Sequence, residues 1–305
     1  MISAPSSFTS RLVNGLLAIK PLADFAKYQA RTMMIERAEK MGVPWRQNVK
    51  DFSEHNWESE KAQIENPNLK YPDYYLCSFH AYEAGNLNWE AAWEVESAAL
   101  AVHSTIWKET DGINPQGDGK LRQAYHDVLQ AQLMEKPTDI LDLGCSVGMS
   151  TFALGETYPQ AKITGLDLSP YYLAVANYRS QEQNKKVDWV HGAAEGTGLG
   201  EQSFDLVSAF LMFHELPQDA ALAIFSEAHR LLRPGGYFAL MDMNPTSPIY
   251  RQMPPYILTL LKSTEPYLDQ YFTLDISQAL MDTGFEKPTI TPISPRHRAV
   301  IALKT

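Results

Sequence analysis

The chain has 305 residues, of which 45% are apolar, 11% aromatic and 20% charged, so it can bury a large core and lacks the composition of a disordered protein. Its 26 basic and 36 acidic residues leave a formal net charge of −10, which argues against binding nucleic acid through phosphate contacts. The two cysteines, Cys77 and Cys145, are too few for a disulfide framework or a cysteine-based zinc site, and they favour a reducing, cytoplasmic compartment.

The chain also lacks the pattern of a membrane protein. Its longest uncharged apolar run, residues 206–213, is far shorter than a membrane span. The first 20 residues lack the contiguous apolar core of a signal peptide, although their serines and the absence of acidic residues leave an organellar targeting segment open as an alternative. The length predicts two structural units.

Residues 1–136 are predicted to form a mostly helical N-terminal region. Apolar residues recur there at helical spacing in segments around 22–34, 89–107 and 121–133. In the second segment, Glu96 and His103 share a stripe with tryptophans and are expected to face inward. Between the helices, residues 71–89 crowd aromatic side chains among Gly, Asn and Pro, which is typical of a binding surface or of packing between the helices and a sheet.

After Lys136-Pro137, short apolar runs alternate with helical segments, which is the pattern of βαβ units in a mainly parallel sheet. The predicted strands are 139–143, 162–166, 187–190, 204–210 and 237–242, and the predicted helices between them are 149–157, 170–183 and 218–232. Ser169-Pro170 is a favourable helix start, and residues 233–236, with the sequence Arg-Pro-Gly-Gly, are expected to end a helix.

The C-terminal stretch adds a helix around 274–282 and two strands, 289–293 and 299–303. The short connection between these strands demands a hairpin, which places one antiparallel strand in the sheet. Residues 244–271, rich in Pro, Tyr and Leu, are expected to form an inserted loop and helix near the ligand mouth. The predicted fold is therefore α/β, with a helical region over 1–136 followed by a sheet domain over 137–305.

A turn of small residues follows the first predicted strand, in the run Asp142-Leu143-Gly144-Cys145-Ser146-Val147-Gly148. Small residues let a ligand approach the backbone, and the amides at the following helix start favour an anionic group. The spacing departs from the G-x-G-x-x-G turn of dinucleotide-binding enzymes. It is similar to motif I of class I S-adenosylmethionine (SAM) dependent methyltransferases, in which Asp142 is the leading acid.

A second acid, Asp167, ends the next predicted strand 25 residues later, where a carboxylate can accept hydrogen bonds from ribose hydroxyls. In the methyltransferase family this acid binds the ribose. Segments 190–195, 203–207 and 227–236 follow in the family's order. The resemblance covers about residues 137–305 and is closest to small-molecule methyltransferases, including the ubiquinone and menaquinone biosynthesis type. It implies a Rossmann-like seven-stranded sheet.

The resemblance also implies SAM as the cofactor and methyl transfer by in-line displacement. Many relatives carry Asp where Ala193 stands, so Glu195 or a backbone carbonyl is expected to bind the adenine amino group instead. Cys145 is interpreted as a small turn residue rather than a nucleophile. The expected cofactor-binding residues are Asp142, Gly144, Cys145, Ser146, Gly148, Asp167, Leu168, Ala194, Glu195 and Phe210.

After the fourth predicted strand, His214 is the titratable residue best placed to reach a methyl acceptor. It is predicted to be catalytic, as a general base or a hydrogen-bond partner of the acceptor, against the alternative of a loop histidine that only packs. Glu215 either orients that imidazole or is an exposed carboxylate at a helix start. No Asn/Asp-Pro-Pro-Tyr motif follows this strand, and neither cysteine lies in a nucleophile motif, so methylation of nucleic-acid bases is disfavoured.

The predicted acceptor is a small, aromatic or hydrophobic molecule, methylated on oxygen or carbon rather than nitrogen. No metal site is expected, because Glu96 and His103 lie seven residues apart. A cofactor-binding pseudo-methyltransferase that serves a partner protein and an NAD(P) enzyme stay open as alternatives. The candidate acceptor-binding residues are Tyr75, His80, Tyr82, Trp89, His103 and Tyr250.

Overall fold

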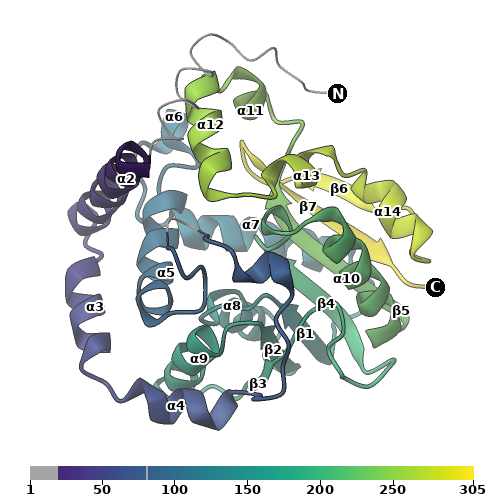
Figure 1. Cartoon of the computed structure of the whole chain (residues 1–305). Coiled ribbons are helices and arrows are strands. Elements are labelled where there is room, and N and C mark those ends of the chain that lie inside the picture. Colours follow the sequence, from purple (N-terminus) through teal and green to yellow (C-terminus); the bar gives the residue numbers. More distant parts are fainter. Residues whose placement is uncertain (1–19, 80–81) are drawn as a thin grey trace.

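A central seven-stranded sheet organises the protein, with the strand order β3-β2-β1-β4-β5-β7-β6 (Figure 1). The computed structural model describes residues 20–79 and 82–305, so His80 and nearly all of the segment considered for targeting lie outside the described residues. The strands are β1 (Asp139–Leu143), β2 (Lys162–Asp167), β3 (Asp188–His191), β4 (Phe204–Phe210), β5 (Leu232–Met243), β6 (Thr289–Pro292) and β7 (His297–Leu303).

The sheet is mainly parallel, and one strand runs the other way. Strands β1 to β5 pair in parallel, whereas β7 is antiparallel to both β5 and β6. The predicted C-terminal hairpin and its single antiparallel strand are therefore confirmed. Because the chain leaves β1 toward β2 on one side and returns to β4 on the other, the order reverses between β1 and β4. In open α/β sheets, ligands bind at the carboxyl ends of the strands at such a point.

Helices cover both faces of the sheet. The side chains of β1 alternate, so that Ile140 packs on one face with Leu121 and Tyr125, while Leu141 packs on the other face with Phe225. The helices of these two layers include α7 (Gly117–Gln132) and α8 (Met149–Thr157) on the first face and α10 (Gln218–Leu231) and α14 (Ile276–Asp282) on the second. Helix α7 precedes the predicted boundary at residue 137 and yet packs directly on the sheet.

Two of the remaining N-terminal helices, α4 and α5, pack on α9 (Pro170–Glu182). Helix α5 lies between α2 and α3 on one side and α9 on the other, and α4 packs on α9. Figure 1 shows α2, α3 and α4 along the left rim of the molecule. These elements are α2 (Lys20–Lys40), α3 (Trp45–Ser53), α4 (Trp57–Ile64), η1 (Asp73–Leu76), α5 (Trp89–His103) and α6 (Lys108–Asp111).

The expectation that Glu96 faces inward is wrong in part. Its side chain is 39% exposed and pairs with Arg179 on α9. The buried carboxylate of α5 is that of Glu94, 1% exposed, which accepts hydrogen bonds from Arg31 on α2 and from the Tyr82 hydroxyl. Helical periodicity places both glutamates close to the inward stripe, and the partners offered by neighbouring helices decide which of them is buried.

Between β5 and α14, the chain forms α11 (Pro248–Gln252), α12 (Pro255–Thr264) and α13 (Leu268–Thr273). This is the segment predicted as an insert, and it is more helical than expected. Ser247 begins α11 by accepting a hydrogen bond from the Ile249 amide, and Pro248 occupies the first helical position. No helix among the described residues is long and apolar enough to cross a membrane.

The Arg-Pro-Gly-Gly run follows the end of α10, as predicted, but it lies inside β5, which begins at Leu232, five residues before the predicted strand. Leu232 pairs with Phe204, and the register shifts before Leu206 pairs with Tyr237. Gly235 has a φ of +82°, a conformation that favours glycine, and its amide donates to the Lys304 carbonyl. The run is therefore an irregular strand entry rather than a loop.

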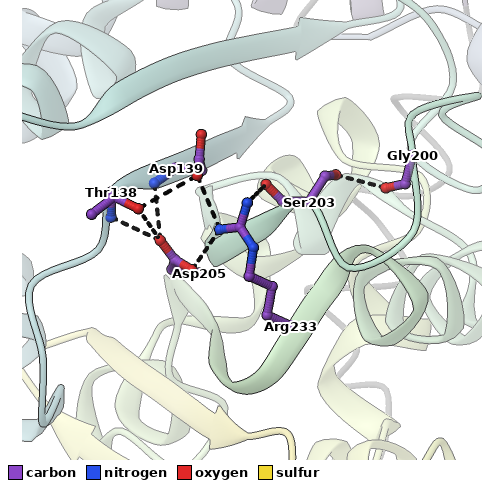
Figure 2. Close-up of polar contacts among 6 residues, drawn as sticks. All are labelled: Thr138, Asp139, Gly200, Ser203, Asp205 and Arg233. Carbon is purple, nitrogen blue, oxygen red and sulfur yellow. Dashed lines mark hydrogen bonds and ion pairs between the residues drawn. The ribbon is translucent and has the colours of Figure 1, made fainter.

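Arg233 in this run ties the amino ends of β1 and β4 together through Asp205 (Figure 2). Asp205 accepts hydrogen bonds from the Thr138 amide and hydroxyl, at 2.8 and 2.7 Å, and forms an ion pair of 2.6 Å with Arg233. Burial opposes the charge of Asp205, but these donors outweigh it and lower its pKa to about 2. Two of the segments that carry the family resemblance thus stabilise the sheet edge opposite the ligand-binding edge.

Candidate functional site

A cavity of about 1330 Å³ lies at the carboxyl ends of the strands. Its wall is formed by the turn after β1, the ends of β2 and β4, the N-terminal helices α2 and α5, and the segment over residues 244–271. A typical ligand pocket measures about 300–1,000 Å³. This cavity therefore has room for a cofactor and an acceptor side by side.

The turn after β1 depends on left-handed backbone conformations. Gly144 has a φ of +63° and Gly148 a φ of +85°, and a Cβ at Gly144 would lie 2.5 Å from the sulfur of Met212. Ser146, also left-handed at +50°, lines the cavity. Its hydroxyl is buried and has no hydrogen-bond partner among the described residues. A buried hydroxyl without a partner is the kind of group that a bound ligand satisfies.

Asp142 is the leading acid of this turn, but it lies outside the cavity wall. It is fully buried, and its carboxylate accepts hydrogen bonds of 2.7 and 2.6 Å from the hydroxyls of Ser150 and Thr151 in the first turn of α8. Burial raises the pKa of Asp142 to about 6, against the effect of these hydroxyls. Asp142 thus positions the helix start, and its direct contact with a cofactor stays a prediction.

Asp167 ends β2 and lines the cavity. Its two oxygens accept hydrogen bonds of 2.8 Å from the amides of Ser146 and Ser169, so the carboxylate is held against the turn after β1. Burial raises its pKa to about 6. With the Ser146 hydroxyl on the same wall, these groups fit the nucleoside cofactor that the resemblance implies, because a carboxylate can accept two ribose hydroxyl hydrogens.

The other predicted cofactor residues divide into two groups. Cys145, Leu168, Ala194 and Phe210 line the cavity. Burial raises the pKa of the Cys145 thiol well above its usual range, with a further contribution from Asp167. Glu195 is not among the lining residues, and its carboxylate accepts a 2.6 Å hydrogen bond from the Tyr74 hydroxyl of η1. Its role in adenine binding stays a prediction.

His214 lies in the wall after β4, held by a buried acid that the sequence interpretation missed. Its Nδ1 lies 2.8 Å from Oδ1 of Asp242, and its amide donates to Oδ2 at 3.2 Å. Burial opposes protonation of the imidazole, but Asp242, followed by Glu265 and Glu215, outweighs it and raises the pKa of His214 to about 10. The raised pKa favours the protonated imidazole at neutral pH, and Nδ1 is the ring nitrogen that faces Asp242.

The turn that presents His214 is strained. Leu211, a residue with a branched side chain, has a φ of +57°, and its amide donates to the Met241 carbonyl at 2.8 Å. The short η2 helix (Phe213–Glu215) follows directly. Such strain persists where the surroundings over-determine the backbone, and it gathers at functional sites. Asp242, the residue before the end of β5, lies beside this turn. A sequence pattern does not reveal this contact, because Asp242 comes 28 residues after His214 in the chain.

One group of side chains beside this turn could hold a metal ion. His214, Glu215 and Glu265 each offer a ligand atom, and these atoms lie within 4.8 Å of one another, in the part of the chain that the structure describes. The sequence interpretation expected no metal site and did not consider this group, in which Glu265 lies 50 residues from Glu215. The same carboxylates also help to keep the imidazole of His214 protonated.

Four of the predicted acceptor residues line the cavity: Tyr75, Tyr82, His103 and Tyr250. Trp89 does not. Its ring stacks 6.2 Å from that of Trp93, and its Nε1 donates to Glu58 on α4, so it packs between helices. The assignment of Trp89 to acceptor binding is therefore not supported by its position.

His103 brings a further network into the cavity wall. It pairs with buried Asp118 at 2.7 Å, and Asp118 receives Nε of Arg122 at 2.8 Å. Arg122 lines the cavity, and its guanidinium lies 4.4 Å above the ring of Phe210. Burial lowers the pKa of His103 despite Asp118. The sequence signal for this network is weak, because an acid and an arginine four residues apart are equally common on the exposed face of a helix.

The chain is similar to known proteins over its sheet domain. Residues 140–236 match the family model described as a methyltransferase domain. An uncharacterized methyltransferase of Synechocystis sp. is 34% identical over 164 residues, covering 53% of this chain and 74% of the relative. A ubiquinone biosynthesis O-methyltransferase of Saccharophagus degradans is 30% identical over 202 residues, covering 63% of this chain and 83% of the relative.

Solved structures share the fold at low sequence identity. A protein of Pyrococcus horikoshii, 16% identical, matches with a TM-score of 0.50 and covers 67% of this chain and 99% of its own. A phosphoethanolamine N-methyltransferase of Haemonchus contortus, 15% identical, matches with a TM-score of 0.51 and covers 73% of this chain and 61% of its own. Together with the turn after β1 and the acid that ends β2, the sequence matches place this chain in the class I S-adenosylmethionine-dependent methyltransferases, in the branch that acts on small molecules.

Proposed function

We propose that the protein methylates a small, mainly apolar or aromatic acceptor on oxygen or carbon. The observation that carries this proposal is a single cavity that joins the cofactor turn, His214 and an apolar wall. Much of that wall comes from the segment after β5, with Met253, Leu260 and Leu261. Mainly apolar walls with a few placed polar groups are typical of sites for small organic ligands.

The charge state of His214 supports a defined role for it. An imidazolium whose Nδ1 is held by Asp242 donates from Nε2 to the acceptor and stabilises an ionised acceptor oxygen. The hydroxyl proton of the acceptor leaves to solvent when the acceptor binds as its anion. The cofactor supplies an electrophilic methyl group, so that the oxygen–carbon bond forms as the sulfur–carbon bond breaks. His214 then acts by hydrogen bonding, the second of its two predicted roles, rather than as a neutral base.

The N-terminal region is proposed to select the acceptor. Helices α2 and α5 and the η1 turn place Met34, Val95 and Tyr75 in the cavity wall. Glu195 connects this region to the sheet domain through the Tyr74 hydroxyl. If the helical region selects the acceptor, the cofactor-binding sheet can stay the same while the acceptor changes, because acceptor specificity then depends on the part of the cavity that the N-terminal helices line.

The names of the relatives support the acceptor class. One is a ubiquinone biosynthesis O-methyltransferase, and another, 28% identical over 151 residues, is a demethylmenaquinone methyltransferase. Both names describe methylation in the synthesis of quinones. An acceptor with an acidic hydroxyl on a ring agrees with the cationic His214 in this chain.

The test is a screen of metabolite extracts with SAM carrying a labelled methyl group, followed by mass spectrometry of the labelled product. The expected product carries the label on an oxygen or carbon of a ring-containing or hydrophobic molecule. His214→Gln is expected to lower turnover while SAM affinity stays near that of the wild type. A labelled nitrogen, or equal turnover by His214→Gln and wild type, would contradict the proposal.

A further inference from the structure

A guanidinium in the cavity wall lacks a counter-charge. Arg296 lines the cavity just before β7, where its carbonyl accepts a hydrogen bond of 2.9 Å from the Asn244 amide. Its Nε is buried and has no hydrogen-bond partner among the described residues. Its Nη2 makes only a long contact, 3.4 Å, with the Val102 carbonyl. No carboxylate in the described part of the chain forms an ion pair with it.

The charged and titratable groups around Arg296 do not supply a negative charge to balance it. The groups that influence its pKa are the Tyr250 hydroxyl and the Arg37 guanidinium. The charge of Arg296 in turn helps to lower the pKa values of His103 and His297. Arg37 on α2 donates to the Ala101 carbonyl at 3.4 Å and has no ion pair among the described residues. This part of the wall therefore carries excess positive charge.

The acid that pairs with His103 is itself already balanced by another charged group. Asp118 contacts His103, and Arg122 binds it through both Nε and Nη2, at 2.8 and 3.2 Å, so its charge is balanced within that network. Burial lowers the pKa of Arg296, and Arg37 lowers it further, which reflects the missing counter-charge. Folded proteins seldom bury a charged group without a partner unless a ligand provides one.

We propose that Arg296 binds an oxyanion on the methyl acceptor, a carboxylate or a phosphate, with the Tyr250 hydroxyl beside it. This inference rests on the proposed function, because it identifies the acceptor of that reaction more closely. The planar guanidinium presents paired donors that match the two oxygens of a carboxylate or phosphate.

The position of Arg296 also constrains the shape of the acceptor. In the pairing of β5 with β7, Met243 at the end of β5 lies opposite His297 at the start of β7. Arg296 immediately precedes His297, so it lies next to the end of β5. The oxyanion site is therefore beside the strand end that carries the His214–Asp242 pair. The acceptor class is then a hydroxylated, mainly apolar acid, with the reacting oxygen at His214 and the anionic group at Arg296.

Calorimetry on the protein saturated with S-adenosylhomocysteine tests this site. The probes are 4-hydroxybenzoate, 2-naphthoate and phenyl phosphate, each compared with its neutral amide or alcohol. The variants are Arg296→Gln and Arg296→Lys, and the matched control is Arg251→Gln, since Arg251 is an exposed arginine on α11, next in the chain to Tyr250. The wild type is expected to prefer the anionic probes, and Arg296→Gln to lose about 10- to 100-fold of that preference.

Arg296→Lys is expected to retain part of the preference, because it keeps the charge but not the paired donors. Binding of neutral probes and of S-adenosylhomocysteine should not change. A preference for anions that survives in Arg296→Gln, or that Arg251→Gln loses equally, would overturn the inference. So would a fall in S-adenosylhomocysteine affinity and unfolding temperature in Arg296→Gln, because that result assigns Arg296 to the fold.

A second arm separates this inference from the proposed function. The metabolite extract is divided by anion exchange at pH 7 before incubation with labelled SAM. Labelled product from the retained, anionic fraction supports both proposals. Labelled product from neutral or cationic fractions alone supports methyl transfer and overturns the oxyanion site. No labelled product from any fraction counts against the proposed function itself, and the oxyanion site falls with it.

Discussion

The pair formed by His214 and Asp242 can be tested by replacing Asp242 with Asn. This substitution keeps the shape of the side chain and removes its charge. The carboxylate now accepts hydrogen bonds from the His214 ring, from the His214 amide and from the Met243 amide, at 2.8, 3.2 and 2.6 Å. An amide can accept from only part of this set, so one of the donors will face an NH₂ group.

The magnitude follows from the pKa of His214. Its rise from 6.5 to about 10 corresponds to roughly 5 kcal/mol, at 1.36 kcal/mol for each pH unit, shared among Asp242 and two glutamates. Breaking a buried ion pair by removing one partner costs about 3–5 kcal/mol. Since the pKa is raised in the folded state, this stabilisation is complete below pH 6.5 and is lost as the pH rises through 10. Asp242→Asn should therefore cost about 3 kcal/mol at pH 6 and much less above pH 10.

Two measurements check this reasoning. Urea unfolding of both proteins between pH 6 and pH 10.5 should show a free energy that falls with pH in the wild type and changes less in Asp242→Asn. NMR of ¹³C-labelled histidine, assigned with His214→Gln, should show His214 titrating near pH 10 in the wild type and closer to 6.5 in the variant. A wild-type His214 that titrates below pH 8, or an equal titration in both proteins, would refute the argument.

Three further changes have defined outcomes. Asp167→Ala should weaken SAM binding by about 1.5–3 kcal/mol in calorimetry, because ribose hydroxyls lose a charged acceptor, and unchanged affinity would count against this cofactor contact. Asp205→Asn should lower the free energy of unfolding at pH 7 by about 1–2 kcal/mol, after allowance for solvent screening. Because the pKa of Asp205 is lowered in the folded state, its stabilising effect is present above pH 3.8 and is lost as the pH falls through 2. The free energies of unfolding of the two proteins, measured by chemical denaturation, should therefore converge near pH 2. Gly144→Ala should destabilise the protein by about 1–2 kcal/mol and weaken SAM binding, because of its left-handed φ and the approach of its Cβ to Met212, whereas Gly196→Ala, with open space at its Cβ, should change neither.

The sheet domain could be predicted closely because its signals are local. Strands β1 and β4 and helix α8 have the predicted bounds, since each is a short apolar run or helical segment between turn residues. The beginning of β5 could not be predicted. The Arg-Pro-Gly-Gly run is a pattern typical of loops, and it belongs to a strand only because neighbouring residues pair with Phe204 and Lys304. Local propensity yields there to the partner strands.

The residues of the candidate site also divide into those that a local sequence pattern predicts and those that it does not. Asp167 and Ser146 belong to segments that a family pattern describes, and both line the cavity. Asp242, which holds His214, and Arg296 carry no local signal at all. Their importance depends on burial and on partners distant in sequence, and neither property can be obtained from residue spacing.

The sequence by itself determined the α/β class, the cofactor turn and the net negative charge of the chain. These features depend on the spacing of neighbouring residues and on composition, which are complete in the chain before it folds. Only the tertiary structure decided that Glu94 rather than Glu96 is buried, that Trp89 packs between helices, and that the pKa of His214 is raised by Asp242. Each of these depends on which groups are removed from water together, and the packing of distant segments sets that choice.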